Sequence, residues 1–183
     1  MVAGSTTSGL WFGNLCLGAG GGHTLGFWSN PNGESLFGAD DLANMVALNL
    51  VNGDGSAFDP AGYPAFNSWI LGANAVNIAN MLSAQMAAAY LNTTNSSAVF
   101  NLGASGSAMV YAPGAAGANS GGFISLSALI AEANASLAAN PLTLADHPAR
   151  AYQTALKNAL DSANNNLNFV QPSAATCPAP AFP

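Results

Sequence analysis

The sequence has very little charge. Asp, Glu, Lys and Arg together make up 5% of its 183 residues, whereas a soluble domain carries roughly 25%. The chain has two basic side chains, Arg150 and Lys157. So few cations cannot neutralise nucleic-acid phosphates or hold anionic lipid headgroups. We therefore expect neither a nucleic acid nor an anionic membrane surface as a partner.

Long apolar runs are also missing. The most apolar stretch, residues 70–90, is interrupted by Asn74, Asn77, Asn80 and Gln85, so it falls short of the ~20 apolar residues that span a membrane. We expect no membrane insertion. The opening residues MVAGSTTSGLWFG lack the basic region of a signal peptide. A leader has then been removed, or export uses another route.

Cysteine is scarce and sits near the two ends, at Cys16 and Cys177. In an acidic chain rich in Asn, Ser and Thr, we interpret the pair as a disulfide that joins the terminal segments. On the chain-entropy model, a loop of this length contributes roughly 4–5 kcal/mol of stability. The sequence leaves open whether the bridge forms within one chain or between two. Two cysteines are too few for a structural zinc site, and we expect no cofactor.

Asn, Ser, Thr, Gly and Ala take the place of charge. These residues form hydrogen bonds but repel nothing, so little electrostatic repulsion opposes self-association. Two interpretations follow and stay open at this stage. The chain is a subunit that lives inside an assembly of copies of itself, or it is a secreted monomer with a low-charge surface.

The periodicity predicts one mainly α domain over residues 1–183, with about four helices and a minor β hairpin. Residues 1–37 form a Gly-rich and aromatic-rich arm and loop, 38–168 the helical core, and 169–183 a Pro-rich tail. Helices are expected from Ala39 to about Leu50, over 67–92, over 125–139, and from Asp146 onward. The runs AVFNLG and SAMVYAPG predict the hairpin near 98–113, followed by a flexible connector at 114–122.

The longest predicted helix carries an apolar stripe that includes Leu71, Val76, Leu82 and Met86. Asn74, Asn77 and Asn80 recur at i, i+3 along one flank of it. Amide side chains donate and accept hydrogen bonds, which suits a neutral contact between identical subunits, but a solvated face explains them equally. The same two interpretations apply to the run at 164–166. The subunit-contact candidates are therefore Asn74, Asn77 and Asn80, together with Leu10, Trp11 and Phe12 of the arm.

Catalytic motifs are absent: the chain has no G-x-S-x-G and no H-E-x-x-H. His23 lies in GHTLGFWSNPNG, where it serves as a base or donates a hydrogen bond to a loop carbonyl, and the second is the main interpretation. His147 and the Asp40–Asp41 pair belong to helix starts. Phe27 and Trp28 are expected to anchor the loop in the core. We therefore predict a protein that is not an enzyme.

A second loop has oxygen-bearing side chains at alternating positions, as calcium loops do. It lacks the terminal Glu of an EF-hand, because Tyr63 stands there. We interpret it as a turn that uses Asn, Asp and Gly for backbone conformation, with calcium as the weaker alternative and no other metal expected. The candidate ligands are Asn52, Asp54, Ser56 and Asp59.

Three stretches together resemble a group of exported bacterial proteins. GHTLGFWSNPNG resembles their opening motif of Gly, an aromatic, Trp, any residue, Asn and Pro. NSWILGANAVNIANMLSAQMAAAYLN is similar to their Ala-rich helix, and LKNALDSANNNLNFVQPSAATCP to their closing segment. The resemblance implies export and a cell-surface or extracellular location, with no established activity. The group carries a cysteine before its aromatic–Trp pair and a basic residue after it; here His23 and Ser29 stand near those places.

We predict a secreted structural protein that self-assembles into an extracellular filament, sheath or surface layer. One alternative is a monomeric adhesin that binds glycans through Trp11, Trp28, Trp69 and Tyr63. The other is a secreted hydrolase that uses His23.

Overall fold

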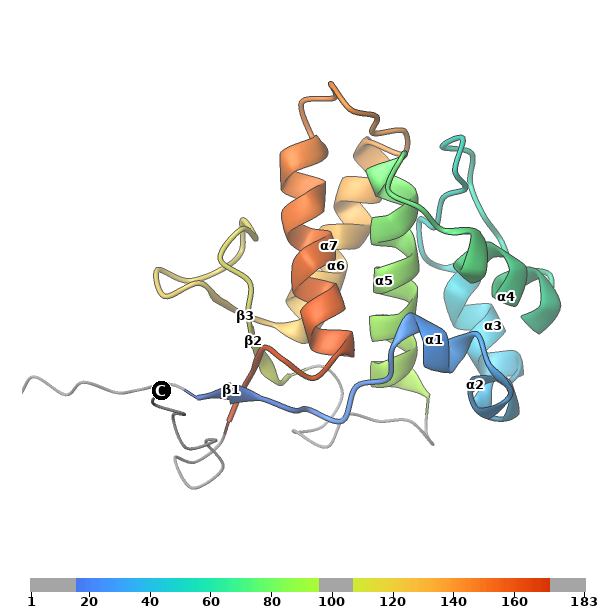
Figure 1. Ribbon diagram of the computed structural model, residues 1–183, viewed down its shortest axis with the longest axis horizontal. Coiled ribbons are helices and arrows are strands. Elements are labelled where there is room, and N and C mark those ends of the chain that lie inside the picture. The colour runs from blue at the N-terminus through green and yellow to red at the C-terminus, as the bar shows by residue number, and fades with distance from the viewer. Residues whose placement is uncertain (1–15, 96–106, 172–183) are drawn as a thin grey trace, which may run out of the picture.

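The computed structural model describes residues 16–95 and 107–171. Within these ranges the chain is mainly α with a small antiparallel sheet, which confirms the predicted fold class (Figure 1). The helices are α1 (Leu25–Trp28), α2 (Pro31–Leu36), α3 (Ala39–Val46), α4 (Tyr63–Gly72), α5 (Ile78–Thr94), α6 (Leu126–Ala139) and α7 (Arg150–Asn164), and the strands are β1 (Leu17–Gly18), β2 (Met109–Tyr111), β3 (Phe123–Ser125) and β4 (Phe169–Val170).

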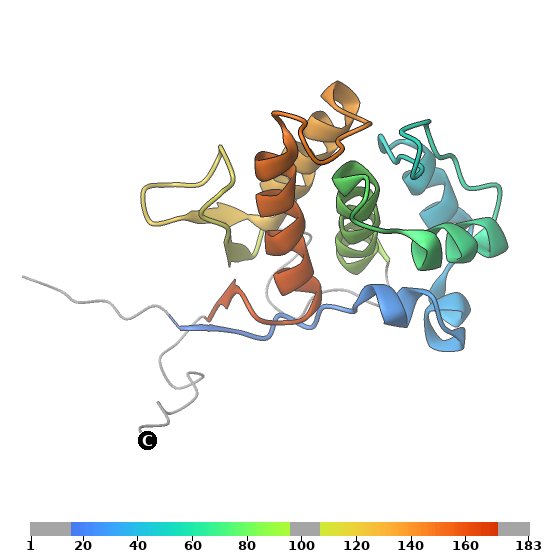
Figure 2. The same cartoon turned by 45° about the horizontal axis from the view of Figure 1, so that its top comes forward.

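Helix α5 forms the centre of the molecule. It packs against α6 and α7 on one side and against α1 and α3 on the other (Figure 2). Its burial extends around the whole helix, which is typical of a helix inside a core. Ala84, Ala87 and Ala88 are fully buried and let the neighbouring helices approach closely. Leu82 and Met86 are fully buried too, and each contributes roughly 1.5–3 kcal/mol by leaving water.

The predicted long helix over 67–92 is in fact two helices, α4 and α5. Asn74 and Asn77 break it, because each side-chain oxygen accepts a hydrogen bond from the main chain two residues on, at Val76 (3.0 Å) and Ala79 (3.2 Å). Such local bonds offer the backbone an alternative to helix. The break puts two residues of the predicted core stripe in solvent, Leu71 at 67% exposure and Val76 at 75%.

Two other helix boundaries differ from the sequence prediction. Helix α3 begins at Ala39 as expected but ends at Val46, because the chain then runs extended to bury Leu50 and to bond Val51 N–H to Ser83 Oγ at 2.9 Å. Helix α7 begins at Arg150 instead of residue 146, after a hydrogen-bonded turn. In contrast, α6 begins where predicted, with the Ser125 hydroxyl accepting from Ala128 N–H.

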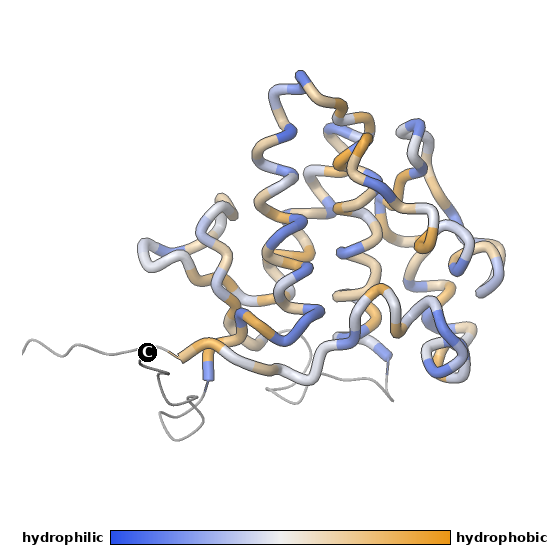
Figure 3. The backbone as a smooth tube through the Cα atoms, in the orientation of Figure 1, coloured by the Kyte–Doolittle hydropathy of each residue, from blue (hydrophilic) through white to orange (hydrophobic). Residues whose placement is uncertain are grey.

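The sheet has the order β1-β4-β2-β3, and every neighbouring pair is antiparallel. Strand β2 pairs with β3 through Val110 opposite Ile124, and with β4 through Val110 opposite Phe169. The first half of the predicted hairpin, 98–103, lies outside the described residues. The predicted flexible connector 114–122 is a defined turn that joins β2 to β3, in which Asn119 N–H donates to Phe123 O at 2.9 Å. Figure 3 shows apolar residues where β1 and β4 meet.

Candidate functional site

The stretch GHTLGFWSNPNG is anchored on α5 by one asparagine. Trp28 is fully buried, where the sequence predicts a core anchor, and its Nε1 donates to Asn92 Oδ1 at 3.1 Å. Asn92 also accepts from His23 N–H at 3.1 Å and donates to His23 O at 2.9 Å. Phe27 is half-buried against the same core. The stretch therefore fixes the N-terminal segment to the central helix.

The His23 side chain differs from both sequence interpretations. Its hydrogen bonds to Asn92 use main-chain atoms, and its ring stacks on Phe27 with centroids 3.9 Å apart. The Trp28 ring meets it edge-on at 6.2 Å. Burial disfavours the imidazolium and lowers the pKa of His23. The role that the contacts assign to His23 is packing.

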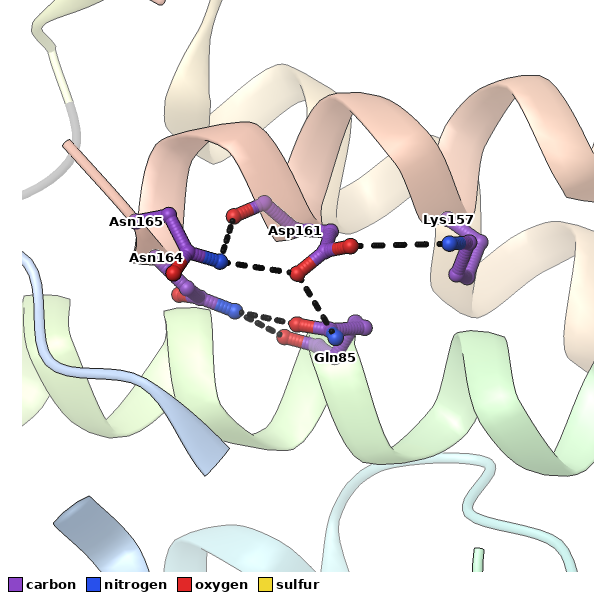
Figure 4. A network of polar contacts seen from close by, with 5 residues as sticks. All are labelled: Gln85, Lys157, Asp161, Asn164 and Asn165. Carbon is purple, nitrogen blue, oxygen red and sulfur yellow. Dashed lines mark hydrogen bonds and ion pairs between the residues drawn. The ribbon is translucent and has the colours of Figure 1, made fainter. Parts of the chain in front are cut away.

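Amide side chains link α5 to α7 through the interior (Figure 4). Asn164, which is fully buried, donates to Gln85 O at 3.0 Å and to Gln85 Oε1 at 2.9 Å. Gln85 Nε2 in turn donates to Asp161 Oδ1 at 3.1 Å. Asp161 pairs with Lys157 at 3.5 Å on the surface. The network continues inward from Asn164, whose Oδ1 accepts from Asn92 at 3.0 Å.

Asn165, Asn166 and Asn168 complete this arrangement. Asn165 donates twice to Asp161. Asn166 adopts φ 63°, and its side chain accepts from Gly20 and Gly22 N–H at 3.1 and 2.7 Å. Asn168 donates to Tyr111 O on β2 at 3.0 Å. Asn164 and Asn166 thus bond within one chain instead of facing a second subunit, whereas Asn165 stays exposed on the surface.

Asn77 and Asn80 are likewise not subunit contacts, because they are 1% and 2% exposed. Asn77 Oδ1 accepts from Thr143 N–H at 2.8 Å, and Asn80 Nδ2 donates to Val51 O at 2.9 Å. Asn74 remains exposed. The other contact candidates, Leu10, Trp11 and Phe12, lie outside the described residues.

Arg150 holds together the two loops at the starts of α5 and α7. Its guanidinium donates to Ala75 O at 2.8 Å, to Val76 O at 3.2 Å and to Thr143 O at 3.1 Å. This scaffold presents three aliphatic side chains to solvent, which we call the loop-end surface: Val76, Leu142 and Leu144, which are 75%, 44% and 47% exposed. The surface lies at the upper end of the helices in Figure 1. Sequence reasoning missed it, because Val76 reads as part of a helical core stripe.

A pocket of about 210 Å³ opens beside the loop-end surface. Leu142 adjoins it, since a Cβ placed on the pocket residue Gly55 would come within 2.8 Å of the Leu142 Cβ. Asn77 also donates to the main chain of the pocket residue Pro141 at 3.1 Å. The walls are mostly apolar and come from Asn49, Leu50, Val51, Gly55, Ala57, Leu137, Ala138 and Pro141.

Three of the four calcium-loop candidates form hydrogen bonds with one another. Asp54 Oδ1 accepts from the Ser56 main chain at 2.9 Å and from its hydroxyl at 2.6 Å, and these bonds lower the pKa of Asp54. Asn52 donates to Ser56 Oγ at 3.1 Å. Asp59 takes no part in these bonds. This is the hydrogen-bonded turn that composition favours, and the described residues bring no three His, Cys, Asp or Glu side chains together as a metal site.

Glu132 and Tyr152 form a cluster that the sequence does not signal. The Tyr152 hydroxyl donates to Glu132 Oε1 at 2.5 Å, and the two carboxylate oxygens also accept from the main chain of Ala116 and Gly117. Burial and this carboxylate raise the pKa of Tyr152 to about 12. The cluster fastens the β2–β3 turn to α6 and α7.

The remaining candidate residues from the sequence make hydrogen bonds within the fold or are buried in it. Asp41 accepts from Gly38 N–H at 2.9 Å, as expected at a helix start, and from Asn95 at 2.8 Å. His147 Nδ1 accepts from Ala149 N–H at 3.2 Å. Of the predicted glycan platforms, Trp28 is fully buried and Trp69 is 8% exposed, so neither presents a ring face to a sugar.

Cys16 is not a free thiol. Gln171 N–H donates to Cys16 O at 2.9 Å beside the β1–β4 pair, so the chain passes Cys16 six residues before its expected partner Cys177. Cys177 itself lies outside the described residues. Pairing within one chain is therefore within reach and stays a prediction.

Comparison of the chain with protein-family models, curated proteins and solved structures finds no match. The resemblance to exported bacterial proteins consequently stays a prediction. Among the described helices, none has both the length and the apolar character needed to cross a membrane.

Proposed function

We propose that this chain is a secreted, non-enzymatic structural subunit that self-assembles with copies of itself into an extracellular filament, sheath or surface layer. The observation that carries the proposal is the loop-end surface. Val76, Leu142 and Leu144 are exposed on two loops that Arg150 holds together at one end of the molecule, and exposed apolar side chains gathered at one place mark contact sites.

The distribution of charge supports the same role. Both basic side chains have partners within the chain, Arg150 with main-chain carbonyls and Lys157 with Asp161. Buried amides provide the polar contacts of the interior, which leaves few charges on the surface to keep copies apart.

An extracellular or cell-surface location is part of the proposal. It rests on the amide-rich, charge-poor composition, on the expected Cys16–Cys177 bridge and on the resemblance to exported bacterial proteins. The Asn166 contacts with Gly20 and Gly22 hold residues 20–22 on the body of the subunit, close to Cys16 and its expected bridge.

Negative-stain electron microscopy of the unmodified chain at rising concentration tests the proposal. We expect regular polymers or layers from the unmodified chain and from Val46→Ser, a control that removes an aliphatic side chain of 51% exposure on α3. The double variant Val76→Ser/Leu144→Ser should give dispersed particles. Dispersed 18.2 kDa particles of the unmodified chain at every concentration would contradict self-assembly.

A further inference from the structure

We propose that assembly is head-to-tail: Leu10, Trp11 and Phe12 of one copy bind the loop-end surface and its adjoining pocket on the next copy. This inference rests on the proposed function and names the contact that would produce it. The partner is a second copy of this chain, and the loop-end surface lies at the opposite end of the subunit from strand β1, which follows the arm in the sequence.

The positions of the two regions give the first argument. Strand β1, which leads directly back toward residues 10–12, pairs with β4, and β4 follows the end of α7. The loop-end surface is built around Arg150, the first residue of α7. The 15 residues of α7, about 22 Å at 1.5 Å per residue, therefore separate the two. Figure 1 shows β1 below the end of α7 and the loops above its start.

Reach within one copy is short for this contact. Trp11 lies six residues before Leu17, so full extension takes its Cα at most about 22 Å from β1. That distance equals the length of α7 alone, while β1 lies beyond one end of the helix and the loop-end surface beyond the other. Reach therefore favours an arm from another copy on this surface.

The chemistry of the two regions matches. Leu10, Trp11 and Phe12 are three consecutive large apolar residues in a segment, residues 1–33, without Asp, Glu, Lys or Arg. The pocket has mostly apolar walls and about 210 Å³ of space, and an apolar cavity of about 150 Å³ admits a benzene-sized group. One aromatic ring of the arm fits the pocket, and its neighbours cover Val76, Leu142 and Leu144.

Two different surfaces in contact make the interface heterologous. Such contacts repeat from copy to copy and produce closed rings or open filaments instead of closed twofold dimers. The inference therefore deepens the proposed function: it gives the assembly a direction, with one end that donates the arm and one that accepts it.

A mixing experiment with two full-length variants tests the inference. The arm variant Trp11→Ser/Phe12→Ser keeps an intact loop-end surface, and the surface variant Val76→Ser/Leu144→Ser keeps an intact arm. Each alone should be monomeric by light scattering after size exclusion. Mixed in equal amounts, they should form pairs of twice the monomer mass and nothing longer, because only one competent interface exists per pair. Far-UV circular dichroism checks that both variants fold.

The outcomes separate the inference from the proposed function. If the unmodified chain stays monomeric, both fail. If the unmodified chain and the arm variant assemble alike, the inference is wrong and self-assembly stands. Another segment or another surface then makes the contact between copies. A mixture that stays monomeric also overturns the inference, since the arm and the surface then do not bind each other.

A peptide provides a second measurement that needs no folded variant. A synthetic peptide of residues 5–15, added in excess to the unmodified chain, should occupy the loop-end surface and shorten the assemblies. A scrambled peptide of the same composition should leave their length unchanged. Equal effects of the two peptides, or no effect of either, would overturn the inference.

Discussion

Asn164 on α7 donates hydrogen bonds to both the main-chain oxygen and the side-chain oxygen of Gln85 on α5, at 3.0 and 2.9 Å. The bond from Asn92 satisfies the remaining oxygen of Asn164. A neutral residue thereby joins the two most closely packed helices without burying a charge, which would be costly in a core.

Asn164→Ala should lower the free energy of unfolding by about 2–4 kcal/mol, because it removes the partner of the buried Gln85 Oε1 and one of the two bonds of Asn92 Nδ2. The matched control is Asn165→Ala. Asn165 is the next residue and bonds Asp161 at the exposed surface, so its loss should stay under about 1 kcal/mol. Urea unfolding followed by circular dichroism measures both, and equal losses would contradict the central role of the interior network.

Gly33→Ala should destabilise the GHTLGFWSNPNG stretch strongly. A Cβ at Gly33 would stand 2.3 Å from Phe27 O and 2.6 Å from Trp28 Cα, which are main-chain atoms that cannot move aside without shifting the anchor. We expect a loss of about 2 kcal/mol or more from overpacking. Gly53→Ala is the control, since nothing lies within 4 Å of its Cβ position, and its thermal midpoint should be unchanged or slightly raised.

Stability should fall in alkaline solution through Tyr152. Its pKa in the folded chain is raised to about 12, above the usual value near 10, so the unfolded chain loses this proton first. The stabilisation is complete below about pH 10 and is lost as the pH rises toward 12. Thermal midpoints across this range should fall more steeply for the unmodified chain than for Tyr152→Phe. Parallel curves would show that the Glu132 contact does not favour the protonated tyrosine.

His23 should make the protein less stable in acid, whereas Tyr152 makes it less stable in alkali. Burial lowers its pKa in the folded chain below the usual value of about 6.5, so the unfolded chain takes up the proton first as the solution is acidified. Stability is therefore complete above about pH 6.5 and declines as the pH falls below it. His23→Phe keeps a ring to stack on Phe27 and should remove this part of the decline. A nuclear magnetic resonance titration that finds an imidazole pKa at or above 6.5 would contradict the packing role.

The sequence predicts the fold where local chemistry decides the outcome. The start of α6 follows from the N-cap at Ser125. Trp28 is fully buried, as expected for a large aromatic side chain. The break between α4 and α5 also has a local signal, Asn74 and Asn77, but the apolar spacing around them reads equally well as one helix. Periodicity alone does not rank a side-chain cap against continued helix.

The candidate surface and the amide network could not be predicted in the same way. Asn92 and Asn164 meet across 72 positions of sequence, and Glu132 contacts a turn and a second helix. The position of an asparagine in the sequence is the same whether its side chain faces solvent, a second subunit or the core of its own chain. Val76 is exposed in a loop whose main chain bonds Arg150, a contact between residues 74 positions apart.

Sedimentation equilibrium of the unmodified chain over a wide concentration range tests the central claim most directly. Self-assembly through the loop-end surface predicts a weight-average mass that rises with concentration well above 18.2 kDa for the unmodified chain and for Val46→Ser. For Val76→Ser/Leu144→Ser the mass should stay at that of one chain. A constant monomer mass for the unmodified chain, or identical curves for all three proteins, would contradict it.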